Sequence, residues 1–195
     1  MTNVERAARA IEDGELAVYP TETVYGMGTD AVDADAVERV FEVKGRARDK
    51  PVSLGVPSVE RALEYVNPTD RESAFMREFL PGPVTVVVQR RDVVPDVLTA
   101  GREKVGVRVP DHELGLALLE TSDAPVTATS ANLSGTGSVR EVDELSDEVR
   151  EEVSEVVDGG RTDGMESTVV DIETETIHRR GAMADTTESW LAERE

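Results

Sequence analysis

The sequence has no cysteine and only two histidines in 195 residues. The lack of cysteine excludes disulfides, a thiolate nucleophile and a zinc–cysteine site. His112 and His178 lie in unrelated sequence contexts, so neither a multi-histidine metal site nor a Ser-His-Asp triad is expected, and no resident metal is predicted. The chain also lacks a run of eighteen apolar residues and a signal-peptide core, which predicts a cytoplasmic protein without a transmembrane helix.

Lysine is almost absent, since only Lys44, Lys50 and Lys104 occur and arginine supplies the other cations. The chain carries 21 Lys and Arg against 41 Asp and Glu, a formal net charge of −20. A disordered acidic tail would gather its acids in one block, whereas these acids alternate with apolar positions along the chain. This pattern is typical of a folded protein from a salt-rich cytoplasm, as in haloarchaea, where the screening length falls to roughly 3 Å.

Apolar periodicity predicts alternating helices and strands in one domain, residues 1–195. The expected helices cover 3–14 (capped by Asn3), 33–45 (ended by Gly45), 58–66 (capped by Ser58), 69–80, 111–120 and 186–195. The expected strands cover 16–20, 51–56, 84–89, 104–110 and the start of 124–132, with a hairpin formed by 167–172 and 176–180. The acidic stretch 142–160 is expected to be helical and then extended. Because the order is not strictly β-α-β, we expect an α/β fold with a twisted mixed sheet rather than a doubly wound one.

The segment "VKGRARDKP", residues 43–51, contains four cations, and the rest of the chain has a single lysine, Lys104. A cation at a helix C-terminus complements the helix dipole, which accounts for Lys44 alone. The whole cluster favours a polyanion site instead, because phosphate suits a lysine point charge combined with an arginine fork such as that of Arg46.

Two loops are further candidates for binding an anion. "ATSANLSGTGS", residues 128–138, is rich in hydroxyls and glycines that can wrap an anion, but it lacks P-loop spacing, and its composition alone favours an ordinary polar loop. "YPTETVYGMGTDA", residues 19–31, offers close backbone approach at its glycines or is a plain turn. Strand alternation there predicts Thr21 and Thr23 on one side and Glu22 on the other.

Arg108 lies inside the apolar strand "GVRVP", where a charge is costly unless its head is paired. Its guanidinium therefore either reaches the rim of the core or binds a carboxylate or phosphate in a cavity. Ser167 and Thr168 begin another strand beside Glu166, where a hydroxyl serves as a ligand contact or as a structural cap. The residues alone thus favour a nucleotide or another phosphate ligand.

Six stretches together resemble the YrdC family, the threonylcarbamoyl-AMP synthases, from about Glu15 to Gly181. They are "YPTETVYGMGTDA", "FEVKGRARDKP", "FLPGPVTVVV", "VGVRVPDH", "TATSANLSG" and "ESTVVDI". The resemblance implies a YrdC-like domain with a concave anion-binding cavity. It also implies a nucleotidyltransferase that converts L-threonine, bicarbonate or CO2, and ATP with Mg2+ into L-threonylcarbamoyladenylate, pyrophosphate and water. A partner transferase complex would then modify adenosine 37 of ANN-decoding tRNAs.

The resemblance also assigns roles to individual residues. The family's Lys-x-Arg…Ser-x-Asn tetrad, read as catalytic, matches Lys44, Arg46, Ser130 and Asn132. The ATP-binding set is then Lys44, Arg46, Lys50, Ser130, Asn132, Ser138 and Arg179. The threonine-binding set is Thr23, Arg108, Ala128 and Ser167, with Arg108 taking the carboxylate. This chain departs from the family at Gly55, where relatives often carry a histidine, and it ends before the extra domain of longer relatives, so it is either the short form or truncated.

Two alternatives remain from the sequence. One is an RNA-binding or ribosome-maturation YrdC-like protein without synthase activity, although the net charge of −20 disfavours extensive phosphate contacts and leaves only transient tRNA contact at the basic cluster. The other is a carbamoyl-transfer module of the hydrogenase-maturation type, which sits in much longer, zinc-finger-containing chains. A 195-residue chain without cysteine disfavours it.

The acidic composition predicts a salt-dependent fold. Lowering KCl from molar to millimolar concentration should lower the melting temperature, because the carboxylates then repel one another without screening. Circular dichroism melts across a KCl series measure this, and a melting temperature that does not change with salt would contradict the interpretation.

Overall fold

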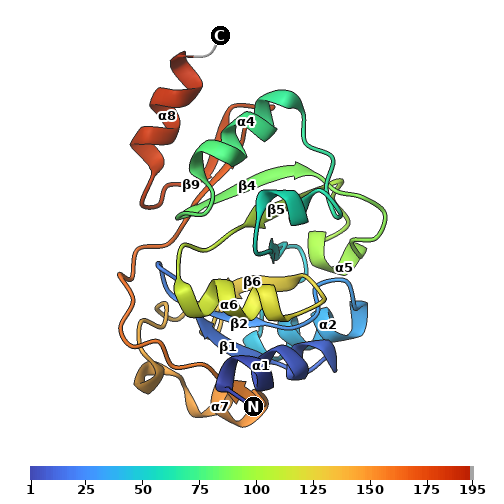
Figure 1. The fold of residues 1–195 in the computed structure, drawn as a ribbon, viewed down its shortest axis with the longest axis vertical. Coiled ribbons are helices and arrows are strands. Elements are labelled where there is room, and N and C mark those ends of the chain that lie inside the picture. The colour runs from blue at the N-terminus through green and yellow to red at the C-terminus, as the bar shows by residue number, and fades with distance from the viewer. Residues whose placement is uncertain (194–195) are drawn as a thin grey trace.

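The computed structural model describes residues 1–193, which form a nine-stranded mixed sheet with helices packed on it (Figure 1). The strands lie in the order β7-β1-β2-β6-β3-β5-β4-β8-β9. Their bounds are β1 (Ala17–Pro20), β2 (Tyr25–Gly28), β3 (Ser53–Gly55), β4 (Val84–Gln89), β5 (Lys104–Arg108), β6 (Val126–Ser130), β7 (Glu155–Val156), β8 (Thr168–Asp171) and β9 (Thr176–Arg179). The pairs β1–β7, β3–β5 and β4–β8 are parallel and the others antiparallel, so the mixed α/β fold is confirmed.

Capping side chains and glycine set the ends of several helices. Their bounds are α1 (Asn3–Glu12), α2 (Ala34–Lys44), α3 (Val59–Ala62), α4 (Asp70–Phe79), α5 (Asp96–Thr99), α6 (Glu113–Thr121), α7 (Asp147–Glu152) and α8 (Ala184–Glu193), with a 3-10 turn at Val142–Glu144. Thr2, not the expected Asn3, caps α1, because its hydroxyl accepts from Glu5 N while the Glu5 carboxylate accepts from Thr2 N. Gly45 ends α2 in the left-handed conformation, with φ of 58°. The last two residues of the terminal helix expected over 186–195 lie outside the described part.

Alternation along β4 and β5 gives the centre of the sheet two different faces. One face carries the fully buried valines of the main core: Val84, Val86, Val88, Val105 and Val107. The other carries Thr85, Val87, Gly106 and Arg108, which line a cavity. Because the side-chain period of a strand is two, the same strands supply both the dry core and the polar face.

Strand β2 and helix α5 were not expected from the sequence. Gly26 and Gly28 have low strand propensity, yet β2 needs them because the Tyr19 ring of β1 lies across both. A Cβ on Gly26 would lie 2.9 Å from Tyr19 Cζ, and one on Gly28 would lie 2.5 Å from Val126 Cγ1. The expected β8–β9 hairpin is confirmed.

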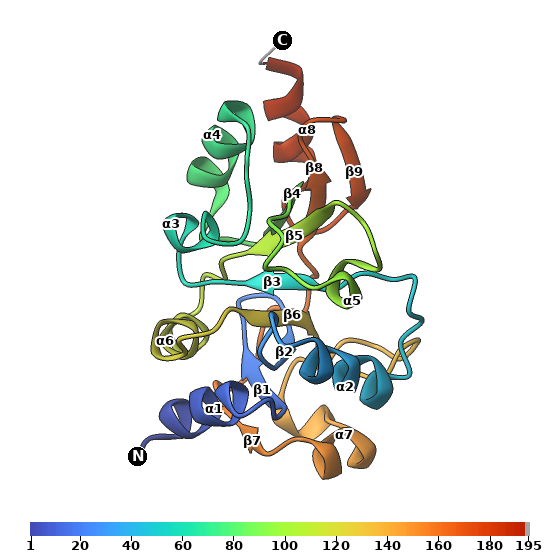
Figure 2. The ribbon, with the colours of Figure 1, turned by 90° about the vertical axis from the view of Figure 1, so that its right-hand side faces the viewer.

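Helices α2 and α7 share a core cluster with β1 and β2, and two further groups of helices cover other parts of the sheet. Helices α1 and α6 pack on β1 (Figure 1), and α4 and α8 stand beside the β4–β8 part of the sheet (Figure 2). Phe75 of α4 stacks on Phe79, with ring centroids 4.3 Å apart, and meets Trp190 of α8 edge-on at 4.9 Å. Within residues 1–193, no helix is long and apolar enough to cross a bilayer.

Replacing Phe75 by alanine should destabilise the fold by about 3–5 kcal/mol, because a fully buried ring joins α4 to α8 and to the main core. Denaturant unfolding at constant high salt measures the loss. Val93→Ala is the control, since Val93 is 50% exposed and should change stability by less than about 0.5 kcal/mol. Equal losses in the two variants would show that the α4–α8 contact contributes nothing specific.

Candidate active site

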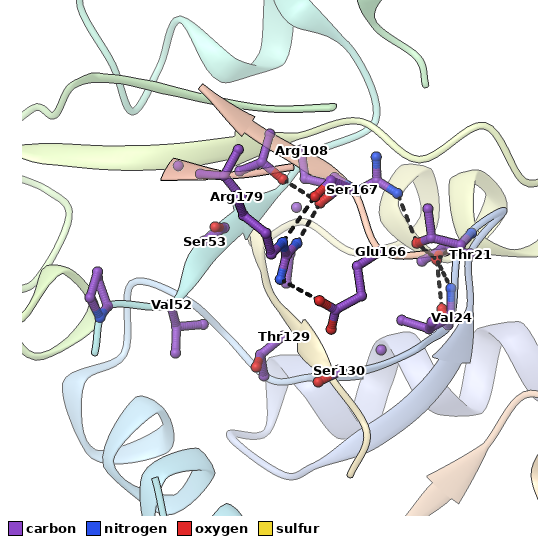
Figure 3. A pocket seen from close by; sticks show the side chains of 18 of the residues that line it. Thr21, Val24, Val52, Ser53, Arg108, Thr129, Ser130, Glu166, Ser167 and Arg179 are labelled. Carbon is purple, nitrogen blue, oxygen red and sulfur yellow. Dashed lines mark hydrogen bonds and ion pairs between the residues drawn. The ribbon is translucent and has the colours of Figure 1, made fainter. Parts of the chain in front are cut away.

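The polar face of the sheet is hollowed into a cavity of about 410 Å³ (Figure 3). Its walls come from β3, β4, β5, β6, β8 and β9, from the turn after β1, and from the segment after α2. Small residues keep its floor open, as at Gly106, where a Cβ would lie 2.5 Å from Ser53 Oγ and 2.8 Å from Thr85 Cγ2. The cavity is large enough for a small-molecule ligand.

Lys44, the last residue of α2, is buried and ties the helix end to the loop after β6. Its Nζ donates to the carbonyl of Ser130 and, at 2.6 Å, to the carbonyl of Asn132. An ammonium has three donors, so one has no hydrogen-bond partner among the described residues. Burial lowers the pKa of Lys44 to about 8, with Arg46 acting in the same direction and Glu166 against it.

Arg46 lines the cavity and is held by backbone carbonyls alone. Its Nε donates to Lys50 O at 3.0 Å and its Nη2 to Pro51 O at 2.9 Å. Burial lowers the pKa of Arg46, and the charge of Arg179 adds to this effect. Within residues 1–193, no carboxylate forms an ion pair with Arg46. Its charge is therefore open to an incoming anion.

The rest of the basic cluster does not face the cavity. Arg48 pairs with Glu38 and Glu42 of α2 and lies over the Phe41 ring, 5.2 Å from its centroid. Lys50 is exposed and is not among the cavity-lining residues. The cluster thus divides into a cavity side and a surface side that the sequence did not separate.

Arg108 is 6% exposed, and its guanidinium is held from several sides. Nη1 donates to Gly82 O and, at 3.4 Å, to Val84 O. Nη2 donates to Thr23 Oγ1 at 3.1 Å and lies 3.0 Å from a carboxylate oxygen of Glu22. Burial lowers the pKa of Arg108, and Glu22 counteracts this. The arginine therefore lies in the cavity wall rather than at the rim of the core.

The expected separation of Glu22 from the two threonines is wrong. Residues 21–24 form a turn in which Thr21 Oγ1 accepts from Thr23 N and Val24 N, both at 3.2 Å, so strand alternation ends at Pro20. The turn directs Glu22 and Thr23 to the same guanidinium. Sequence reasoning missed this role of Glu22, because its partner Arg108 lies far along the chain.

Glu166, Ser167 and Arg179 form a connected network in the cavity wall near Arg108 (Figure 3). Arg179 Nε donates to Ser167 O at 2.9 Å, Nη2 donates to Ser167 Oγ at 2.8 Å, and Nη1 lies 3.3 Å from Glu166 Oε2. Ser138 Oγ donates to Glu166 Oε1 at 3.0 Å. Ser167 Oγ also bonds Thr85 Oγ1 at 2.9 Å. Hydroxyls and charges from four segments thus meet at one wall of the cavity.

Asn132 braces the loop after β6. Its Nδ2 donates to Leu133 O at 2.8 Å and to Thr136 O at 2.9 Å, while its buried Oδ1 has no partner among the described residues. Such an orphan acceptor costs free energy unless a ligand or water satisfies it.

The expected site residues occupy two layers. Those that line the cavity are Thr23, Arg46, Arg108, Ala128, Ser130, Ser167 and Arg179. Lys44, Asn132 and Ser138 stand behind it and contact the lining residues or their loop. Sequence reasoning did not select the additional lining residues Ser53, Thr85, Arg102, Lys104 and His178. Apart from Arg102, which precedes β5, they are ordinary strand positions until the sheet brings them together.

The acidic residues best placed for a cation lie outside the cavity lining. Glu72, Asp171 and Glu173 bring their oxygens within 4.8 Å of one another. Glu72 accepts from Thr69 N at 2.6 Å, and Lys104 Nζ pairs with Asp171 at 2.8 Å and Glu173 at 2.6 Å. These carboxylates therefore already serve as a helix cap and as partners of a lysine.

Residues 9–181 match the model of the Sua5/YciO/YrdC family, described as "Telomere recombination". The chain is 43% identical over 169 residues to the threonylcarbamoyl-AMP synthase of Pyrococcus abyssi and 36% over 170 residues to that of Bacillus subtilis. These matches cover 85% and 86% of this chain but 49% of each relative, so the chain spans about half their length. A putative threonylcarbamoyl-AMP synthase of Methanocaldococcus jannaschii is 32% identical, and the match covers 89% of this chain and 82% of that protein.

Solved structures agree with this relationship. Pyrococcus abyssi Sua5 in complex with L-threonine superposes with a TM-score of 0.82 at 41% identity, covering 91% of this chain and 54% of that one. Escherichia coli YciO gives 0.84 at 25% identity, covering 92% and 89%. The sequence match over residues 9–181 and these superpositions show that the chain belongs to the Sua5/YciO/YrdC family.

Proposed function

We propose that this protein is an L-threonylcarbamoyladenylate synthase, a nucleotidyltransferase acting on L-threonine, bicarbonate or CO2, and ATP. One observation carries the proposal: a single cavity has a buried arginine with hydroxyls at one wall and, at another, Arg46 with the Lys44 ammonium behind the lining. The first arrangement suits an amino acid carboxylate and the second a polyphosphate. The relatives named threonylcarbamoyl-AMP synthase and the threonine complex of P. abyssi Sua5 support it.

At the threonine end, Arg108 would bind the substrate carboxylate, with Thr23, Ala128 and Ser167 beside it. The guanidinium already has four bonding partners, of which the Val84 carbonyl at 3.4 Å is the weakest. A substrate carboxylate can therefore exchange with Val84 O or take the Nε–H, while Glu22 and Thr23 continue to hold Nη2. Threonine would then be fixed by its carboxylate, with its amine free to react.

At the phosphate end, the proposed catalytic residues are Lys44, Arg46, Ser130 and Asn132. The proposed ATP contacts also include Ser138, Arg179 and, from outside the cavity lining, the exposed Lys50. The threonine amine attacks CO2 and loses a proton to give an N-carboxylate. One oxygen of this N-carboxylate then attacks the α-phosphorus, and the bond to pyrophosphate breaks. The chemistry needs no protein nucleophile but requires positioning and neutralisation of developing negative charge. Mg2+ would arrive with ATP, held mainly through phosphates and water.

The wider assignment is part of the same proposal. The chain would act as a single YrdC-like domain, residues 1–195, in a salt-rich cytoplasm. Its labile product would be passed to a threonylcarbamoyl transferase complex for adenosine 37 of ANN-decoding tRNAs, with at most transient tRNA contact. The RNA-binding alternative has less support, because the cavity arginines face inward and the chain's charge of −20 opposes extended phosphate contacts.

Pyrophosphate release from ATP in molar KCl with Mg2+ tests the proposal. Release that requires both L-threonine and bicarbonate supports the synthase. A folded sample that releases none but binds tRNA in a salt-dependent way would favour the RNA-binding alternative.

Neighbouring arginines provide a matched pair of variants. Arg46→Ala should lower pyrophosphate release by at least about 100-fold, because an electrostatic contact to the reacting phosphates is lost. Arg48→Ala removes the same charge from the same segment but on its surface side, and should change the rate by less than about threefold. Steady-state rates at saturating substrates measure both, and equal losses would contradict the division of the cluster.

Arg108 variants should affect threonine more than ATP. Arg108→Lys keeps the charge but removes the two-pronged fork, so the KM for threonine should rise by about 100-fold while the KM for ATP changes by only a few-fold. Arg108→Ala also leaves the buried Glu22 carboxylate without its ion-pair partner and should lower stability. The lysine variant is therefore the cleaner test. An unchanged KM for threonine would refute the carboxylate assignment.

The buried Lys44 should make ATP binding sensitive to pH. In the free protein, its pKa of about 8 means that the ammonium is lost as the pH rises above this value. A bound polyphosphate raises this pKa, so ATP affinity should be full below pH 8 and fall by up to about tenfold per pH unit above it. Calorimetry from pH 7 to 9.5 measures the profile. Lys44→Arg, which does not titrate in this range, should give a flat one, and a flat wild-type profile would contradict the prediction.

A further inference from the structure

Glu166 is an unexpected residue in the cavity wall. Among the described residues, it is the only acid that lines the cavity, against five cations: Arg46, Arg102, Lys104, Arg108 and Arg179. The chain has 41 acids, so its cavity excludes nearly all of them but retains this one. A site built only to attract an anion gains nothing from a carboxylate on its wall.

The carboxylate stands where groups suited to phosphate converge. One oxygen accepts from Ser138 Oγ at 3.0 Å. The other lies 3.3 Å from Arg179 Nη1 (Figure 3). Its charge also acts on Lys44, since it opposes the downward shift of the pKa of that lysine. Arg46 and Arg179 are close enough for each to feel the other's positive charge. An anion between them relieves this repulsion.

The backbone of Glu166 is fixed while its side chain is free to move. Its carbonyl accepts from Ala182 N at 3.1 Å, and Gly181 packs so tightly that a Cβ there would lie 2.2 Å from that oxygen. The side chain, in contrast, is 41% exposed. A rotamer change alone can therefore withdraw the carboxylate without moving the wall.

We propose that, in the unliganded protein, the Glu166 carboxylate occupies the position that a phosphate group takes when a polyphosphate binds. The phosphate displaces the carboxylate, and Glu166 thereby limits how tightly pyrophosphate is held. The inference rests on the proposed function and deepens it by naming the residue that favours product release. Every ligand that places a phosphate at this position must break the same two contacts of Glu166, those with Ser138 and Arg179. Removing the carboxylate charge should therefore raise the affinity for all such ligands by one common factor. The affinity for a ligand bound at Arg108 should not change.

Calorimetric titration of pyrophosphate, ATP and L-threonine into folded protein, at constant KCl and without Mg2+, tests this. Glu166→Gln should bind pyrophosphate and ATP about three- to tenfold more tightly, by the same factor, because it removes a half-exposed ion pair. Its affinity for threonine should change by less than about twofold. Glu166→Asp keeps the charge but is too short to bridge both partners, and should lie between wild type and Glu166→Gln. Glu148→Gln, on the exposed face of α7, makes the same charge change away from the cavity and should have no effect.

The other outcomes are distinct. Unchanged affinities in Glu166→Gln would show that Glu166 only neutralises Arg179, and weaker pyrophosphate binding would show that it orients Arg179 for the ligand. If the ATP titration is repeated with Mg2+ and the loss of affinity appears only there, Glu166 is a metal ligand. Each of these overturns the inference alone. Wild-type protein that is folded but binds neither pyrophosphate nor ATP would overturn the proposed function itself.

Discussion

The phosphate side of the cavity depends on the buried ammonium of Lys44. This group joins the end of α2 to the loop after β6, two segments that the chain separates by 86 positions. Burying a charge is costly unless it is hydrogen-bonded, and the Ser130 and Asn132 carbonyls supply that compensation. The loop in turn gains a fixed path, which Asn132 extends to Thr136. The charge of Lys44 thereby fixes the position of the loop after β6 and also contributes to the affinity of this side of the cavity for anions.

Strand alternation supplies the rest of the site. The same strands β4 and β5 place valines in the core and a threonine, a glycine and an arginine on the opposite face. The core holds these strands rigidly, so the backbone under the polar face has a fixed geometry. Arg108 also needs partners of its own, since a buried guanidinium must be paired. Glu22 and Thr23 meet that need from the turn after β1.

Local signals in the sequence predicted most of the elements, because caps, glycine stops and alternation act over a few residues. Gly45 at the end of α2, the Ser58 cap of α3 and the β8–β9 hairpin all follow from such signals. The same reasoning failed at residues 21–24, where one threonine hydroxyl reverses the chain and breaks the alternation. It also gave no sign of the Glu22–Arg108 and Glu166–Arg179 pairs. Partners so far apart in the chain leave no local pattern; only the folded sheet brings them together.

The surface acids and the cavity cations have different roles, which the composition alone does not reveal. Most acids lie on the surface, where salt screens them, while the cavity collects cations whose interactions are screened less because they are partly buried. Such a cavity also attracts small inorganic anions from solution. A carboxylate carried by the wall itself differs from these, because its backbone is fixed and it returns to the same place whenever a ligand leaves. Glu166, the one acid of the lining in the part of the chain that the structure describes, therefore sets how much binding free energy an anion must supply to enter. The surface acids leave that amount almost unchanged.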